Sequence, residues 1–175
     1  MADCINALKE WTGKTRATVI YDSTVDEFTH DGLFDKVRGK RNIAIVGFTT
    51  DGDVFGGFYS VAVTKQRLCF RDPNIFAFSF ESHGRCETPQ RFLVKEGLKE
   101  KAFMCFNKDD WSGFVDFWVD VLCNFCLGNE RSKSCCANMS RAFEGLEGTT
   151  LTGKKGTNYR GLFHHCTRLV AIQLE

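Results

Sequence analysis

The sequence feature that most constrains the fold is a pair of apolar runs, residues 42–50 and 53–63, separated by Asp51-Gly52. Both runs are rich in the β-branched and aromatic residues that strands prefer. Asp and Gly tolerate the positive φ angles of a two-residue turn, so this pattern predicts a tight β-hairpin. Gly56 and Gly57 inside the second run indicate a bulge or the close approach of another backbone.

Further strand-like runs occur on both sides of this hairpin, at residues 17–21, 75–80, 101–106 and 168–174. In the second of them, Phe76, Phe78 and Phe80 alternate with smaller residues, which is typical of a strand with two different faces. Residues 114–122 fit either a helix or a strand. Residues 127–160, rich in Gly, Ser, Lys and Asn, have the composition of loops with one weak segment at 139–146.

Two short helices are expected, one over residues 3–11 with Asp3 as its N-cap and one over about 31–38, started by His30 or Asp31. Strands outnumber helices, and no alternating βαβ rhythm occurs. The predicted fold class is therefore α+β and mainly β, an antiparallel β-sandwich flanked by a few short helices. We expect a single domain over residues 1–175, with an N-terminal helix in 1–15 and the sandwich in 16–175.

The charge of the chain is balanced, because 23 basic and 22 acidic residues give a net charge of +1. Such a balance provides no general attraction to nucleic acid. The N-terminal region lacks the apolar core of a secretion signal, and no run approaches the roughly 20 apolar residues of a membrane helix. We therefore expect a cytoplasmic protein without membrane insertion, with the nucleus as a second location. The nine cysteines would be reduced there and mostly buried as small apolar side chains.

Cys123-x-x-Cys126 has the spacing of two ligands on one zinc ion, and four later residues are candidates to complete a tetrahedral set: Cys135, Cys136, His164 and His165. The run around the first two is apolar, however, and cysteine in such a run behaves as a small hydrophobic residue. We therefore expect a chain without a metal or other cofactor. Zinc at Cys123, Cys126, His164 and His165 is the lesser alternative.

Cys135 and Cys136 follow a basic stretch that contains Arg131 and Lys133, whose charges favour the thiolate form. This makes the two cysteines candidates for reversible oxidation, and a thiol-based, peroxide-reactive enzyme is one alternative function. No catalytic set is assigned. Asp22 and Ser23 lack the glycines of a nucleophile elbow and have the pattern of an ordinary turn.

A basic run places four positive charges within six residues, at Lys36, Arg38, Lys40 and Arg41. Such a cluster is able to contact phosphates or to serve as a nuclear import signal. It gives a second alternative function, an oxidant-responsive, DNA-binding transcription regulator. The simpler interpretation is that the first two charges complement the negative end of the preceding helix. Aromatic residues that would stack on bases are not interleaved with the run.

Several segments resemble, in the same order, the motifs of the TLDc domain family, which includes the oxidation resistance proteins. They are residues 19–23, Phe28 and Phe34 with residues 39–42, residues 54–58 with Ser60, and residues 72–80. The region between Cys86 and Trp118 departs from the family pattern, because it lacks the glycine-rich run that members usually carry. Residues 143–151 and 168–174 correspond to the last family segments.

This resemblance implies an antiparallel β-sandwich flanked by a few helices, and a link to protection from oxidative stress. Several family members bind the proton-pumping vacuolar ATPase, so a subunit of that enzyme is the partner that the resemblance implies. The motif residues that would shape a binding surface are Tyr21, Asp22, Ser23, Phe55, Gly56, Gly57 and Asp72. Our leading interpretation is a non-catalytic interaction module whose outer surface, rather than a reactive cleft, binds a protein partner.

Overall fold

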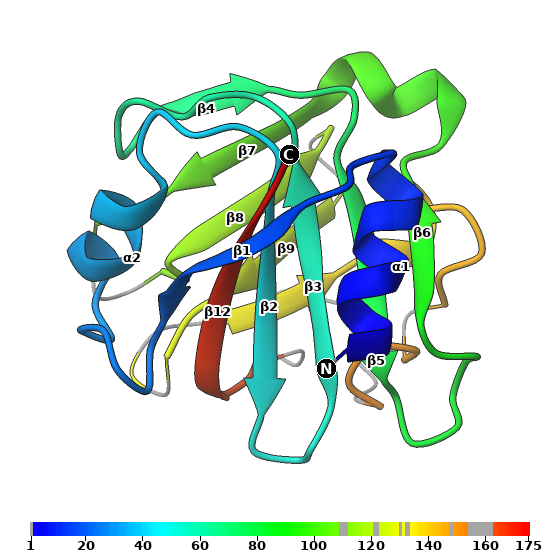
Figure 1. The fold of residues 1–175 in the computed structure, drawn as a ribbon. Coiled ribbons are helices and arrows are strands. Elements are labelled where there is room, and N and C mark those ends of the chain that lie inside the picture. The colour runs from blue at the N-terminus through cyan, green and yellow to red at the C-terminus, as the bar shows by residue number, and fades with distance from the viewer. Residues whose placement is uncertain are drawn as a thin grey trace.

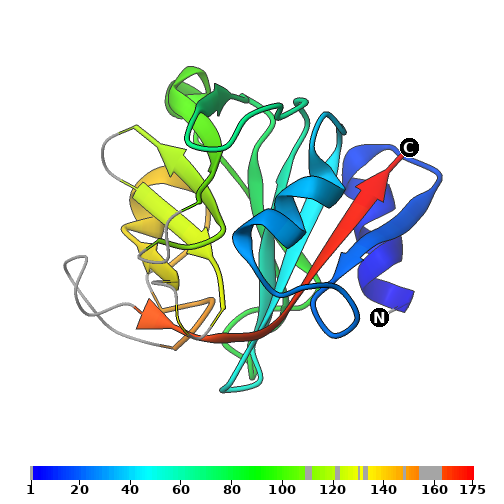
Figure 2. The ribbon, with the colours of Figure 1, turned by 90° about the vertical axis from the view of Figure 1, so that its left-hand side faces the viewer.

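The computed structural model describes residues 2–108, 112–120, 123–129, 131, 134–147, 149–153 and 163–175. Within these residues the strands form two six-stranded sheets that lie face to face, with helix α1 against the outer side of one of them (Figures 1 and 2). All paired strands of the two sheets are antiparallel. The predicted fold class, an antiparallel β-sandwich with a few short helices, is confirmed.

The first sheet, sheet A, has the strand order β1-β12-β2-β3-β5-β6. In this order its strands are Ala17–Asp22, Cys166–Leu174, Ile43–Thr49, Val54–Tyr59, Phe76–Glu81 and Gln90–Leu93. Strand β12, close to the C-terminus, therefore lies between β1 and β2, which both come from the first third of the sequence (Figure 1).

The second sheet, sheet B, has the strand order β11-β10-β9-β8-β7-β4. In this order its strands are Phe163–His164, Ser134–Ala137, Cys123–Leu127, Val115–Val119, Ala102–Phe106 and Cys69–Arg71. The helices are α1 (Ala2–Thr12), α2 (His30–Val37), α3 (Met139–Ala142) and the 3-10 helix η1 (Glu96–Lys101). None of the helices in the described residues is long and apolar enough to span a membrane.

The predicted hairpin is present as β2 and β3, but its turn is longer than two residues. Thr49 and Asp53 still pair, because the Thr49 N–H donates to the Asp53 carbonyl at 2.9 Å. The Gly52 N–H closes the turn on the Thr49 carbonyl at 3.1 Å, and Gly52 has a φ of +86°. The loop therefore holds three residues, with only the glycine in the left-handed region, a common alternative to the two-residue turn.

Gly56 and Gly57 mark a close approach rather than a bulge. The register of β3 against β2 runs without a shift through both glycines, and the irregularity against β5 falls at Val54/Phe55 instead. A Cβ at Gly56 would lie 1.9 Å from the Ile45 carbonyl oxygen, and one at Gly57 would lie 2.6 Å from the Phe117 ring. The two glycines thus let the sheets and neighbouring strands pack closely.

Two hydrophobic cores follow from the two faces of sheet A. The core between the sheets includes Phe55, Phe117 and Phe125, all fully buried. The second core lies between α1 and the outer face of sheet A, where Trp11 packs against three alternating rings, Phe76, Phe78 and Phe80, at centroid distances of 6.1, 6.3 and 6.1 Å. The alternation predicted for this strand is confirmed, and α1 is the element that covers its aromatic face.

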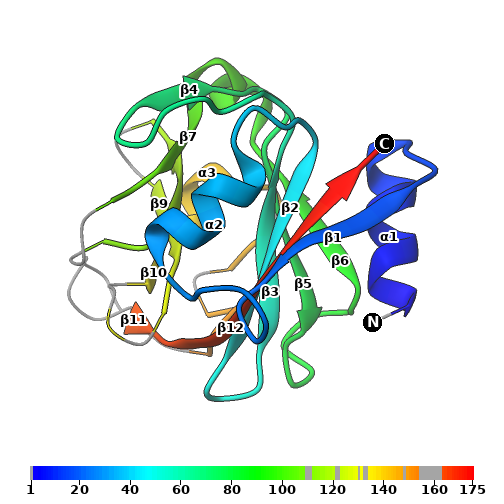
Figure 3. The same cartoon turned by 60° about the vertical axis from the view of Figure 1, so that its left-hand side comes forward.

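Helix α2 lies between the two sheets at one side of the sandwich (Figure 3). It begins at His30, as predicted, but its cap is Thr29, whose hydroxyl accepts a hydrogen bond from the Gly32 N–H at 3.0 Å. Its Leu33 side chain is fully buried in the core between the sheets. In α1, Asp3 lies inside the first turn rather than at the N-cap position, because this helix already includes Ala2.

The chain contains more strands after residue 68 than predicted. Residues 115–119, where helix and strand were both open, form strand β8, and the expected loop region 127–160 contains β10 as well as α3. Strands β4, β6, β9 and β11 were not predicted either. These strands are short, from two to five residues, and their sequences show little alternation. They are strands because a neighbouring strand pairs with them.

Candidate functional site

Tyr21, Asp22 and Ser23 hold the end of β1 to other parts of the fold. The Tyr21 hydroxyl donates to the Glu27 carbonyl at 3.1 Å, and the Ser23 hydroxyl accepts from the Leu169 N–H at 3.0 Å. Asp22 forms an ion pair with Arg168. Hydrogen bonding to this guanidinium lowers the pKa of Asp22 well below its usual range. These three motif residues therefore build the scaffold.

Asp72 is fully buried and accepts hydrogen bonds from the residue that follows β3 and from the segment that precedes β5. Its carboxylate binds the Ser60 hydroxyl at 2.8 Å and the backbone N–H of Asn74 at 2.9 Å. The Asn74 amide in turn donates to the Ser60 hydroxyl at 3.1 Å. Asp72 thus fixes the end of β3 against the start of β5. The remaining motif residue, Phe55, is buried between the sheets, 5.1 Å from the His164 ring.

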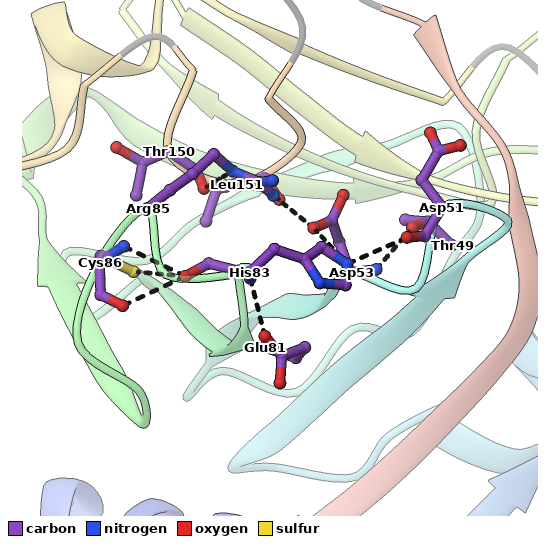
Figure 4. A network of polar contacts seen from close by, with 10 residues as sticks. Thr49, Asp51, Asp53, Glu81, His83, Arg85, Cys86, Thr150 and Leu151 are labelled. Carbon is purple, nitrogen blue, oxygen red and sulfur yellow. Dashed lines mark hydrogen bonds and ion pairs between the residues drawn. The ribbon is translucent and has the colours of Figure 1, made fainter.

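A polar network joins the β2–β3 hairpin to the β5–β6 loop and to residues 150–151 (Figure 4). Asp53 is almost fully buried and forms an ion pair with Arg85. The Arg85 guanidinium also donates to the Thr150 and Leu151 carbonyls, each at 2.9 Å. His83 lies at the exposed side, with Nε2 3.6 Å from the Asp53 carboxylate. Because the Arg85 guanidinium is occupied by Asp53 and by two backbone carbonyls, we infer that this network stabilises the fold.

The side chains considered for zinc, apart from that of Cys135, which lies outside the described residues, do not form a metal site. Cys123 and Cys126 are both buried on β9, and Cys123 contacts the Met139 sulfur at 3.6 Å in the core between the sheets. His164 is buried, whereas its neighbour His165 is exposed. Among the residues that the structure describes, no group of three or more His, Cys, Asp or Glu side chains is placed to hold a metal ion.

The redox candidates lie on β10. Cys136 is buried in the core between the sheets, with 4% exposure, so an oxidant in solution has little access to it. The backbone of Cys135 pairs with Cys126, while its side chain lies outside the described residues. The structure therefore provides no exposed reactive thiol at the position of Cys136.

The basic run lies in the last turn of α2 and the loop that follows it. Lys36 forms an ion pair with Asp26 at 2.8 Å, and Arg38, Lys40 and Arg41 are exposed. The hydrogen bond from the Gly39 N–H to the Val63 carbonyl holds this loop against the segment after β3. The run is thus a surface feature of a structured loop.

A cleft of about 340 Å³ lies between the end of α1 and the β5–β6 side of sheet A, and sequence reasoning missed it. Its apolar lining includes Trp11, Phe58 and Phe76; its polar lining includes Asn42, Ser60 and Asn74; and its basic lining is Lys14, Arg91 and Lys99. No carboxylate is among the described residues that line it. A cleft with aromatic walls and three cationic groups suits an acidic ligand.

The motif residue Asp72 supports the wall of this cleft without lining it. Ser60 and Asn74, which it binds, both line the cleft. On the opposite side the Arg91 guanidinium donates to the Trp11 carbonyl at 2.7 Å, which joins strand β6 to the end of α1. The cleft is therefore built by hydrogen bonds between segments that are far apart in the sequence, and no local motif announces it.

Two facing antiparallel sheets, a helix on the outer face and a cationic cleft beside that helix define a β-sandwich domain with a surface suited to binding. The family model of the TLDc domain matches residues 2–147, which is most of the chain. The chain therefore belongs to the TLDc domain family, as its motifs indicated. A search of curated proteins found no match.

Proposed function

We propose that this TLDc domain is a non-catalytic protein-interaction module that acts in the oxidative stress response or in regulation of the vacuolar ATPase. Its place of action would be the cytoplasm, with the nucleus as a second location. The partner would insert an acidic segment into the cleft between α1 and β6, and a vacuolar ATPase subunit is the partner we favour. The observation that carries this proposal is the combination of three basic side chains and aromatic walls in one cleft.

The charges around the cleft support an acidic partner. Arg91 is exposed, and Lys14 and Lys99 are partly exposed, so all three are accessible to a bound segment. Lys99 pairs with Glu96, whose side chain is 87% exposed. An exchange of this surface ion pair for one with the partner costs little, because exposed pairs contribute only about 0–1 kcal/mol.

The family motifs support a role in binding rather than catalysis. The carboxylates of Asp22, Asp53 and Asp72 each accept hydrogen bonds from internal guanidinium or backbone groups. Carboxylates in such bonds hold loops in place, and general acid–base catalysis needs a group that reaches the substrate. Asp72 acts here as a positioning residue for the cleft.

The test is a pull-down with the purified chain, followed by cross-linking to locate the contact. The wild type should retain a vacuolar ATPase subunit under both reducing and oxidising conditions, with cross-links at the cleft. A variant with Lys14→Glu, Arg91→Glu and Lys99→Glu should lose this partner, since three attractions become repulsions. Binding of the wild type should also weaken as salt is raised.

The matched control changes the same charge elsewhere, with Arg38→Glu, Lys65→Glu and Arg141→Glu, three exposed positions that do not line the cleft. It should keep the partner, and both variants should show the thermal unfolding of a folded domain. Equal loss of binding in the two variants would overturn the cleft as the docking surface. Capture of no ATPase subunit by the wild type would overturn that partner.

A further inference from the structure

Three cysteines and one aspartate lie in one row across sheet B, and the row reaches the edge of the sheet at Cys69. Cys69 on β4 is directly opposite Cys105 on β7, Cys105 is opposite Asp116 on β8, and Asp116 is opposite Cys126 on β9. Directly opposite residues of antiparallel strands place their side chains on the same face of the sheet. The row therefore brings Cys69 and Cys105, which are 36 positions apart in the sequence, side by side.

Cys69 and Cys105 form the closer of the two kinds of antiparallel pair. The Asp72 N–H donates to the Ala102 carbonyl at 2.9 Å, so residues 72 and 102 form a hydrogen-bonded pair in this register. Hydrogen-bonded and non-hydrogen-bonded pairs alternate, and Cys69 with Cys105 is three steps along. In a non-hydrogen-bonded pair the Cα atoms are about 4.5 Å apart, and a disulfide accepts roughly 4.4–6.8 Å.

The two thiols differ in their access to solvent. Cys69 is exposed on the edge strand β4, and Cys105 is buried with 6% exposure. Burial, together with a hydrogen bond that the Cys105 S–H donates to Cys69, raises the pKa of the Cys105 thiol to about 12. An oxidant in solution therefore reaches Cys69 first, while Cys105 remains a protonated neighbour next to it.

We propose that Cys69 and Cys105 are a redox modification site, which a hydroperoxide converts to a disulfide between β4 and β7. In the first step the Cys69 thiolate attacks the peroxide, so that an S–O bond forms, the O–O bond breaks, and the leaving oxygen takes a proton to give water or an alcohol. In the second step the Cys105 sulfur attacks the Cys69 sulfur. The S–S bond forms, the S–O bond breaks, and hydroxide leaves with the Cys105 proton as water.

The geometry of the row also excludes a disulfide between Cys105 and Cys126. Cys126 lies two strands from Cys105, with Asp116 between them, so their backbones are separated by about 9–10 Å. This exceeds the roughly 7 Å beyond which two cysteines are not bridged without backbone movement. Cys126 is therefore the natural control for Cys69. This site is independent of the cleft, because sheet B carries it and the cleft lies against sheet A.

The test is peptide mapping by mass spectrometry after the full chain is treated with hydrogen peroxide and digested without reduction. The wild type and Cys126→Ser should give a linked peptide pair containing Cys69 and Cys105, two hydrogens lighter than the sum of the thiol forms. A reducing agent should restore both peptides. Cys105→Ser should instead leave Cys69 as a sulfenic acid that a dimedone probe traps.

Two results would overturn the proposal. One is a wild type in which peroxide drives Cys69 to sulfinic or sulfonic acid without any Cys69–Cys105 peptide. The other is a linked peptide that joins Cys69 to a different cysteine. Both are read from the wild type, so the test stands even if Cys105→Ser, a change at a buried position, unfolds the domain. Loss of the disulfide would leave partner capture unaffected, which separates this test from that of the docking cleft.

Discussion

Asp22 and Arg168 form a two-point ion pair that joins β1 to β12 across 146 positions of the sequence, with Arg168 Nε 2.9 Å from Asp22 Oδ1. The guanidinium also lies over the Phe48 ring, 5.1 Å from its centroid. Asp22 belongs to a family motif that sequence reasoning had assigned to a binding surface. The ion pair holds together the neighbouring strands β1 and β12 at one edge of sheet A.

Arg168→Met should lower the free energy of unfolding by about 1–2 kcal/mol, because it removes charge-assisted hydrogen bonds from a partly buried carboxylate. Urea unfolding at pH 7 measures this. Since the pKa of Asp22 is lowered in the folded state, the pair stabilises the protein above about pH 4 and its contribution disappears at lower pH. The control is Arg16→Met, which removes an exposed ion pair with Glu175 and should change stability by less than about 1 kcal/mol.

Asp116→Asn should make the protein more stable at pH 7 than the wild type. Burial raises the pKa of Asp116 to about 6, compared with about 3.9 in an unfolded chain. Between about pH 4 and 6 the unfolded state therefore releases this proton first, and stability falls as pH rises. Asparagine does not titrate, so the variant avoids this loss. The free energy of unfolding of the variant minus that of the wild type should therefore be up to about 2–3 kcal/mol larger at pH 7 than at pH 4. Urea unfolding at both pH values measures this. The same difference in free energy of unfolding between variant and wild type at pH 4 and pH 7 would contradict the prediction.

Gly56→Ala and Gly57→Ala should each destabilise the fold by about 1–3 kcal/mol, because neither added methyl has room. The larger loss is expected for Gly56→Ala, whose Cβ meets the Ile45 backbone oxygen, while the Phe117 ring facing Gly57 is able to shift. Thermal unfolding provides the measurement. Gly97→Ala is the matched control, since a Cβ there meets nothing within 4 Å. A loss at Gly97 equal to that at Gly56 would refute the packing argument.

Arg85→Met should cost about 3–5 kcal/mol, because it leaves the buried Asp53 carboxylate without its cation. The double variant Arg85→Met with Asp53→Asn should be more stable than Arg85→Met alone, since it removes the uncompensated charge. A double-mutant cycle in urea decides this. If the double variant were the less stable of the two, the ion pair would not be the source of the cost.

The parts of the fold that sequence reasoning predicted are those with local signals. The hairpin around Asp51-Gly52, the alternation at Phe76, Phe78 and Phe80, and the family motifs all lie within short stretches of chain. Even there, the three-residue turn depends on the Thr49–Asp53 pairing, which composition does not specify. Strand β10 has the sequence Ser-Cys-Cys-Ala, which by itself resembles a loop. It is a strand because it pairs with β9.

The candidate sites were harder to predict because they are assembled from distant segments. The cleft combines Lys14 from the α1–β1 loop, Arg91 from β6 and Lys99 from η1, and none of them stands in a recognisable motif. Cys69 and Cys105 become neighbours only through the register of β4 and β7. The one usable signal was that Cys105 lies in a predicted strand, because β4, three residues long, gave no strand pattern around Cys69.

The place of β12 between β1 and β2 has a consequence for synthesis on the ribosome. The family model matches residues 2–147, yet sheet A lacks one inner strand until residues 166–174 have emerged. Until then β1 has no neighbour in this sheet and β2 has an open edge, which are features that favour pairing with other chains. A nascent chain of this protein therefore depends on residues 166–174, and on any chaperone that shields it meanwhile, to complete sheet A.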